Sequence, residues 1–275
     1  MKVVLVINGL QKGASDAARI AQVHLQDRDI ETEIINCAVD DSSTERPDLI
    51  IALGGDGTLL RAFHLFENAL APLIGINFGK LGFLSGATST DLVKAIDYAL
   101  TADAYKELRT LLEVAVHCTD RSEPLRAIAL NEVMVGRGKN AKVVATALAI
   151  NGHDIYSLRG DGLIVATATG STAYALSAGG PIVSPGYDGM VVVPLASHTL
   201  VQRAIVTAPD DRVSITLPEK YRSDIVIVVD GHDLAVEAEQ VGTIEICRAP
   251  AELELIKLDS RLFYDTVAQH FFSKP

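Results

Sequence analysis

Apolar and polar positions follow two different patterns along the chain. In roughly the first hundred residues, short apolar runs with the length of buried strands alternate with segments of helical spacing. Strands are predicted at residues 3–7, 32–35, 49–53 and 72–76, and helices directly after Gly13 and at 58–66 and 90–102. Such alternation predicts a parallel sheet with helices on its faces, an α/β domain over residues 1–103.

From about residue 105 the pattern changes, because strand-like runs follow one another and helical spacing becomes scarce. Strands are predicted at 108–118, 127–135, 143–150, 191–193, 213–217, 225–229, 243–247 and 253–257, with one short helical segment at 171–178. Residues 104–259 are therefore expected to form a β-rich, sandwich-like domain. The tail from residue 260 turns helical or irregular, and we expect 260–275 to pack back on the first domain.

Composition and charge narrow the class of protein. The 275 residues are 48% hydrophobic and 21% charged, which excludes a disordered or fibrous chain. The formal net charge of −11 is opposite to that of proteins that coat nucleic acids, so any bound phosphate must be held locally. Three cysteines without paired spacing, no signal peptide and no run of about 20 apolar residues predict a cytoplasmic protein without membrane contact.

Glycines surround one carboxylate directly after the apolar run 49–53. The sequence there reads Gly54-Gly55-Asp56-Gly57-Thr58, and helical spacing begins at Thr58. Glycines allow a tight turn and bring backbone N–H groups close to a ligand, and a helix N-terminus favours a phosphate. Asp56 would stand at the carboxyl end of a parallel strand, where open α/β sheets place their sites. The alternative interpretation is an ordinary glycine-rich turn capped by the aspartate.

Other phosphate and metal motifs do not hold. The stretch from Gly75 to Leu81 has only three residues between its glycines, and Leu81 replaces the Ser/Thr of a P-loop. No G-x-G-x-x-G follows a predicted strand, which removes the main support for a Rossmann hydride-transfer enzyme. The seven histidines show no zinc-binding spacing, so no metal ligand is predicted in the chain.

Two further polar groups fall in the β-rich part. Asn131 and Glu132 interrupt the apolar run 127–135, where they point to opposite sheet faces, mark a bulge or form a solvated edge. An amide beside a carboxylate suits the vicinal hydroxyls of a ribose.

The segment 159–181 is dense in hydroxyls and glycines. There Thr172 and Ser177 can exchange hydrogen bonds, Tyr174 can stack on a base, and Asp161 can accept from an amide.

These motifs together resemble the NAD kinases. The blocks are Gly54-Gly-Asp-Gly-Thr58, Asn77-Phe-Gly-Lys-Leu-Gly-Phe83, Asn131-Glu132, and Asp161-Gly162 with Thr169-Gly-Ser-Thr-Ala-Tyr174 and Ser177-Ala-Gly-Gly-Pro181. They stand in the order and spacing of that family, over nearly the whole chain. The resemblance implies transfer of the γ-phosphoryl group of ATP, or of polyphosphate, to the adenosine 2′-hydroxyl of NAD to make NADP. It also implies Mg²⁺ carried with the nucleotide, a homodimer or homotetramer, and a site between the two domains.

The resemblance also assigns roles to single residues. It implies Asp56 as the general base and Gly54, Gly55, Gly57, Thr58 and Arg61 as nucleotide contacts. Asn131 and Glu132 match the pair that holds the adenosine ribose, and Thr172, Ala173 and Tyr174 match the adenine pocket. Lys142 and Arg159 match basic contacts, and Asp161, Ser177 and Ala196 match contacts on the nicotinamide side. Two positions depart from the common pattern: Ala168 where many members have proline, and His232 where many have glutamine.

Two other classes of function stay open on the residues alone. A lipid or sugar kinase can share the Gly-Gly-Asp-Gly-Thr motif, but it leaves Asn131-Glu132 and the 159–181 block unexplained. A dinucleotide-binding module would bind NAD without phosphoryl transfer. An assay with NAD, ATP and Mg²⁺ separates these possibilities.

Overall fold

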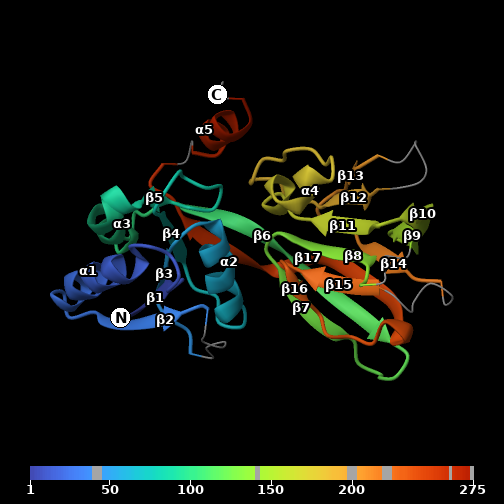
Figure 1. The fold of residues 1–275 in the computed structure, drawn as a ribbon, viewed down its shortest axis with the longest axis horizontal. Coiled ribbons are helices and arrows are strands. Elements are labelled where there is room, and N and C mark those ends of the chain that lie inside the picture. The colour runs from blue at the N-terminus through green and yellow to red at the C-terminus, as the bar shows by residue number, and fades with distance from the viewer. Residues whose placement is uncertain (39–44, 140–142, 197–202, 219–224, 260–261, 273–275) are drawn as a thin grey trace. The chain divides into compact units, whose positions relative to one another are not determined.

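The chain folds into two compact units, residues 1–109 with 253–275 and residues 110–252 (Figure 1). The computed structural model describes residues 1–38, 45–139, 143–196, 203–218, 225–259 and 262–272. The predicted domain boundaries lay at 103–104 and 259–260. The units divide elsewhere because β6 (Lys106–Cys118) and β17 (Val241–Ile256) are continuous strands that each begin in one unit and end in the other.

The first unit is built on a parallel sheet. Its strands run in the order β17, β4 (Leu73–Asn77), β3 (Leu49–Leu53), β1 (Lys2–Ile7) and β2 (Glu31–Asn36), with β5 (Ala87–Thr88) beside β4. The inner strands are continuously apolar apart from Lys2 at the start of β1 and Asn77 at the end of β4, because both of their faces are buried, as the apolar runs predicted. The carboxyl ends of β3 and β4 lead into the two loops that build the site of this unit.

Helices cover both faces of that sheet (Figure 1). α1 (Ala14–Gln26) and α3 (Leu92–Ala99) bury small and branched side chains against Val3, Leu5 and Ile7 of β1. α2 (Asp56–Leu65) lies on the other face, where Leu59 packs so closely on Gly75 that a Cβ there would be 2.7 Å from it. η1 (Ser89–Asp91) leads into α3. The fold of this unit is the α/β arrangement that the sequence predicted.

The second unit is a pair of packed antiparallel sheets. One contains β6, β7 (Leu125–Ala129), β9 (Val144–Ile150), β10 (His153–Gly160), β14 (Val213–Thr216) and β17. The other has the order β13 (Ile205–Val206), β12 (Val191–Leu195), β11 (Gly162–Ala166), β8 (Glu132–Arg137), β15 (Ile225–Val229) and β16 (His232–Asp233). Their inner faces share one apolar core that includes Val114, Val135, Val165, Ile215 and Ile227, so the predicted sandwich is present.

Three strand predictions need correction. The run 127–135 is two strands in different sheets, because the chain turns at Leu130 and Asn131. The runs 243–247 and 253–257 are one strand, β17, and the polar positions between them do not interrupt it. The strands β10 and β11 were not expected, since Gly160 and Asp161 separate two short segments that lack a clear alternating pattern.

The remaining elements are short. η2 (Gly170–Thr172) and α4 (Tyr174–Ser177) follow β11, and η4 (Ala238–Gln240) precedes β17. In the first unit, α5 (Leu262–Val267) and η5 (Ala268–Phe272) close the described chain, and the rings of Phe263, His270 and Phe271 lie against Phe83. None of the helices in the described ranges combines the length and apolarity needed to cross a membrane.

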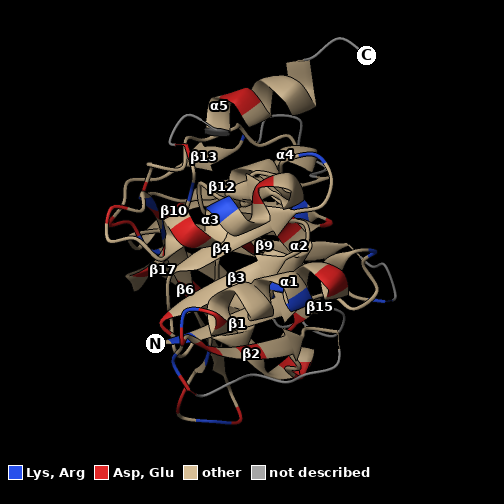
Figure 2. Cartoon of the chain, turned by 90° about the vertical axis from the view of Figure 1, so that its left-hand side faces the viewer, with Lys and Arg blue, Asp and Glu red and all other residues tan. Residues whose placement is uncertain are grey.

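The surface charge agrees with the composition. Figure 2 shows Lys and Arg positions scattered among Asp and Glu positions, not gathered into one basic face in this view. A bound phosphate would therefore meet placed cations and backbone amides rather than a broad basic surface.

Candidate functional site

The glycine-rich loop forms a sharp strand-to-helix turn. β3 ends at Leu53 and α2 begins at Asp56, two residues before the predicted start, so Asp56 lies in the first turn of the helix. A Cβ on Gly54 would be 2.2 Å from the hydroxyl of Thr58, which is why this position is glycine and why Thr58 is buried. A Cβ on Gly55 or Gly57 would meet nothing within 4 Å. The open side of this turn leaves room for an anion at the helix N-terminus.

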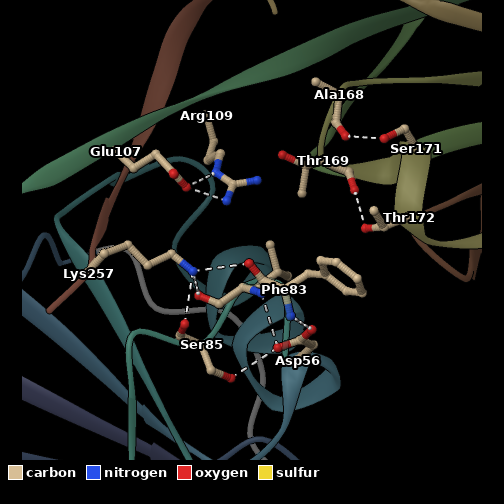
Figure 3. A network of polar contacts seen from close by, with 11 residues as sticks. Asp56, Phe83, Ser85, Glu107, Arg109, Ala168, Thr169, Ser171, Thr172 and Lys257 are labelled. Carbon is tan, nitrogen blue, oxygen red and sulfur yellow. Dashed lines mark hydrogen bonds and ion pairs between the residues drawn. The ribbon is translucent and has the colours of Figure 1, made fainter. Parts of the chain in front are cut away.

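The carboxylate of Asp56 is held by the segment that follows Gly82. Oδ2 accepts the backbone N–H of Phe83 at 2.8 Å, and Oδ1 accepts the N–H of Leu84 at 3.3 Å and the hydroxyl of Ser85 at 3.0 Å (Figure 3). A Cβ on Gly82 would be 2.2 Å from Oδ1, so only glycine fits under the carboxylate. The loops after β3 and β4 are thus joined through this one side chain.

Buried charges lie behind the same segment. Lys257 and Arg109 are 3% and 2% exposed, and Glu107 forms an ion pair with Arg109 (Figure 3). Burial lowers the pKa of Lys257 to about 7, and the charge of Arg109 acts in the same direction. The carboxylates of Glu107 and Asp56 partly offset that effect. Sequence analysis missed these three residues, because single charges at the ends of strand-like runs give no local signal.

In the second unit, Asn131 lies in the turn between β7 and β8, and Glu132 is the first residue of β8. The carboxylate of Asp230 accepts three consecutive backbone N–H groups there, from Leu130 at 2.7 Å, Asn131 at 2.8 Å and Glu132 at 2.9 Å. Asp230 is 5% exposed and has a φ of +47°, in the turn after β15. Sequence analysis also missed Asp230, although an Asp-Gly pair directly after an apolar strand is a turn signal.

The Asn131 turn is also tied to the hydroxyl-rich segment after β11. Thr167 donates its hydroxyl to the carbonyl of Leu130 at 2.6 Å and its N–H to the carbonyl of Asn131 at 2.8 Å. A Cβ on Gly170 would be 2.1 Å from that same carbonyl of Asn131, so the two segments approach as closely as backbones can. The structure therefore brings together two motifs that lie far apart in the sequence.

Figure 3 shows the turn that leads into α4. The hydroxyls of Ser171 and Thr172 donate to the carbonyls of Ala168 at 2.6 Å and Thr169 at 3.1 Å. Ser171 is fully buried and accepts the N–H of Val183, so it is structural. The side chain of Tyr174 is 48% exposed, Ser177 is exposed, and Thr172 and Ala173 are half-buried. The backbone N–H of Tyr174 interacts with the carboxyl group of Glu132, so the start of α4 lies beside that residue.

Glu132 has an unusual environment. Its Oε2 has no hydrogen-bond partner among the described residues. Burial and, to a smaller extent, the charge of Asp230 raise the pKa of Glu132 to about 8, although the backbone N–H of Tyr174 acts in the opposite direction. The side chain is therefore largely protonated at neutral pH, when it can donate as well as accept a hydrogen bond.

Asp161 and Ala196 lie at the opposite end of the same sheet, and Arg159 precedes Asp161 by two residues, in strand β10 of the other sheet. Asp161 precedes β11, its backbone N–H donates to the carbonyl of Leu195 at 2.9 Å, and its carboxylate pairs with Arg137 at 3.1 Å. Ala196, with a φ of +41°, follows β12 directly, and exposed Arg159 lies near the end of β10. Ala166, the partner of Glu132, lies five positions after Asp161, which corresponds to about 17 Å along a strand.

Three predicted residues remain. The side chain of Arg61 is exposed on α2 and donates to the carbonyl of Cys37 at 3.2 Å. His232 is exposed in β16, two residues after Asp230 and paired with Val229. Lys142 lies outside the described residues. Over the described ranges, His, Cys, Asp and Glu side chains nowhere gather in threes at a spacing that could hold a metal ion.

The raised pKa of Glu132 predicts a pH-dependent stability. Between about pH 4.5 and 8, Glu132 is protonated in the folded chain and ionised in the unfolded chain. The contribution of Glu132 to the free energy of unfolding is therefore fully present below about pH 4.5 and is lost as the pH rises through 8. Glu132→Gln stays neutral at every pH. We expect the melting temperature of this variant, measured by calorimetry, to exceed that of the wild type by a margin that grows from pH 5 to 9.

Glu239→Gln removes an exposed carboxylate of the same unit and serves as the control. Its difference from the wild type should not grow over that pH range. Equal pH dependence of the wild type and Glu132→Gln would contradict the protonated state of Glu132.

Comparisons with known proteins cover both units. Residues 3–105 match the ATP-NAD kinase N-terminal domain, and residues 130–258 match the ATP-NAD kinase C-terminal domain. NAD kinases from Marinobacter nauticus and Mycobacterium bovis are 38% and 33% identical over 220 and 243 residues. These matches span 80% and 88% of this chain and 74% and 77% of those proteins.

Solved structures agree with this result. An NAD kinase from Archaeoglobus fulgidus in complex with ATP superposes with a TM-score of 0.78 at 27% identity, over 98% of each chain. The fold of the yeast NADH kinase, solved with NADH, matches with a TM-score of 0.89 at 21% identity, over 100% of this chain and 89% of that one. Because sequence matches extend through both units and include all the motifs described above, the chain belongs to the ATP-NAD kinase family.

Proposed function

We propose that this protein is an NAD kinase that transfers the γ-phosphoryl group of ATP to the 2′-hydroxyl of the adenosine ribose of NAD, giving NADP. The observation that carries this proposal is the family match over residues 130–258, which contains Asn131-Glu132 and the 159–181 block. A lipid or sugar kinase that shared only the Gly-Gly-Asp-Gly-Thr motif is not favoured, because it would not account for that match. ATP enters as its Mg²⁺ complex, so the metal belongs to the substrate.

Asp56 takes the proton of the 2′-hydroxyl as the new bond to phosphorus forms. A carboxylate offers about four lone-pair positions. Oδ1 already accepts two hydrogen bonds, from Leu84 and Ser85, whereas Oδ2 accepts one, from Phe83. Because Oδ2 accepts fewer hydrogen bonds than Oδ1, we take Oδ2 as the atom that receives the proton. The amides of Gly55 and Gly57 and the guanidinium of Arg61 bind phosphate oxygens at the open side of the turn.

The second unit holds NAD. Asn131 and Glu132 bind the hydroxyls of the adenosine ribose, which supply the partner that Glu132 Oε2 lacks among the described residues. Tyr174, with Thr172 and Ala173, packs against the adenine, since an exposed ring beside this turn can stack on a base. Ser177, Asp161 and Ala196 contact the nicotinamide side, His232 lies beside the ribose, and Arg159 and Lys142 bind phosphates.

The test of the activity is incubation of the protein with NAD, Mg²⁺ and ATP, with NADP as the measured product. Diacylglycerol and fructose 6-phosphate serve as parallel acceptors, and polyphosphate serves as an alternative donor. We expect NADP to form and neither of the other acceptors to be phosphorylated. Tight NAD binding without NADP formation would show a binding module instead.

Asp56→Asn separates a general base from a substrate ligand. Asn keeps one acceptor oxygen for Leu84 and Ser85 but cannot take a proton. We expect kcat to fall by about 10²–10⁴-fold, the usual cost of losing a general base. The dissociation constant of NAD, measured by calorimetry, should change by less than about tenfold, or 1.4 kcal/mol. Asp103→Asn, at an exposed carboxylate of the same unit, is the matched control. Loss of NAD binding with wild-type turnover per bound NAD would contradict the role of Asp56.

We infer that the protein acts as a homodimer or homotetramer in the cytoplasm. All three cysteines are thiols rather than disulfides, which suits a reducing compartment. The oligomer is supported by the placement of the predicted NAD contacts. Asp161 and Ala196 lie at one end of the β8–β11 ladder and Glu132 at the other, so the first group would serve an NAD bound to a neighbouring copy.

Subunit mixing tests this arrangement. Asp56→Asn and Asp161→Ala are each expected to be slow at NAD concentrations below KM. In a mixed dimer, one site would then combine both defects and the other would have neither. When equal amounts of the two variants exchange subunits at random, about half of the dimers are mixed, and each mixed dimer has one intact site of its two. We therefore expect about a quarter of the wild-type activity.

Each variant incubated alone through the same exchange procedure is the control. If Asp161 serves the NAD of its own chain, every site in the mixture carries one defect, and the activity stays at the average of the two variants. A molecular mass of one chain by light scattering for a fully active sample would also contradict the proposal.

A further inference from the structure

Lys257 is a buried cation that faces three consecutive carbonyl groups. Its Nζ donates to the carbonyls of Phe83 at 3.0 Å, Leu84 at 2.8 Å and Ser85 at 2.9 Å (Figure 3). An ammonium group has three donors, and all three are used. The lysine comes from the residue after β17, 174 positions beyond Phe83 in the sequence.

The same three residues hold Asp56 from their other side. The peptide group that joins Phe83 to Leu84 donates its N–H to Asp56 and its carbonyl accepts from Lys257. Ser85 likewise bonds Asp56 through its hydroxyl and Lys257 through its carbonyl. The segment is therefore fixed between a carboxylate and an ammonium group, and its peptide dipoles point along the line between them.

The buried position of Lys257 disfavours the charged form of its side chain. Burial and the nearby Arg109 lower the pKa of Lys257, and the charges of Glu107 and Asp56 act in the opposite direction. Asp259 and Thr266 line a small, partly open cavity of about 10 Å³ beside it, which has room for about one water. The ammonium group supplies the donors to three carbonyls that would otherwise lack them, so the cost of burying the charge is offset by the hydrogen bonds that hold residues 83–85. Strongly perturbed groups of this kind gather at functional sites.

We propose that Lys257 is a positioning residue for phosphoryl transfer, which fixes residues 83–85 so that their hydrogen-bond donors hold the Asp56 carboxylate toward the substrate hydroxyl. The inference rests on the proposed role of Asp56 as the base. Lys257 does not contact substrate; it acts through the 83–85 segment. Without the ammonium group, three carbonyls lose their donor and the segment can turn away from Asp56.

Lys257→Met removes the charge and keeps the length and most of the volume of the side chain. We expect kcat to fall by about 10- to 100-fold, since a displacement of about 1 Å in a reacting group can cost 10²-fold. The dissociation constant of NAD should change by less than about threefold, because the residues that bind NAD lie in the other unit. Lys106→Met, at an exposed lysine paired with Glu254, is the matched control and should keep its kcat.

A double-mutant cycle with Asp56→Asn identifies how Lys257 acts. If Lys257 works through the Asp56 carboxylate, Lys257→Met slows the wild type but has little further effect on Asp56→Asn. The proposal would be overturned if the double variant lost the product of the two single losses in kcat, or if Lys257→Met kept the wild-type kcat. Either result would leave the lysine a structural role. Lys257→Gln, which keeps an amide donor, replaces Lys257→Met in the cycle if the methionine variant is not recovered folded.

The two proposals fail in different ways. Asp56→Asn by itself tests whether Asp56 is the base, through turnover per bound NAD. If Asp56→Asn is slow and binds NAD, and Lys257→Met is as fast as the wild type, only the role of Lys257 is overturned.

Discussion

A carboxylate that is partly or fully buried needs hydrogen-bond donors at its oxygens, and this requirement fixes one loop in each of the two units. In the first unit the donors to Asp56 come from three consecutive residues, 83–85, so this one side chain fixes the loop after β4 against the start of α2. In the second unit Asp230 does the same for residues 130–132. Each carboxylate sets the path of a loop that no regular secondary structure supports.

Glycines make these arrangements possible. Gly82 leaves space for the carboxylate of Asp56, and Gly170 lets one backbone lie directly on the carbonyl of Asn131. Gly54 makes the corresponding space for the side chain of Thr58. The motifs that make the sequence resemble its family are therefore largely positions of close approach. They are conditions for the geometry, and the proposed chemistry belongs to the polar residues between them.

The local pattern of apolar and polar residues was sufficient to predict much of the fold. Continuous apolar runs predicted β1 and β3, helical spacing predicted α1, and the glycine-rich turn after β3 pointed to Asp56. Two of the failures share a cause, which is pairing between distant residues. The run 127–135 breaks into two strands because Asp230, 100 residues beyond Leu130, takes its amides. Lys257 was missed for the same reason, because its three partners lie 172–174 residues away.

The central claim is that the Asp56 carboxylate holds the 83–85 segment in place, and amide hydrogen exchange tests it most directly. The amides of Phe83 and Leu84 should exchange slowly in the wild type, since both donate to Asp56. In Asp56→Ala these two amides should exchange much faster, while the amides of Ile74 and Ile76 in β4 keep their protection. Unchanged protection of Phe83 and Leu84 in Asp56→Ala would contradict the account.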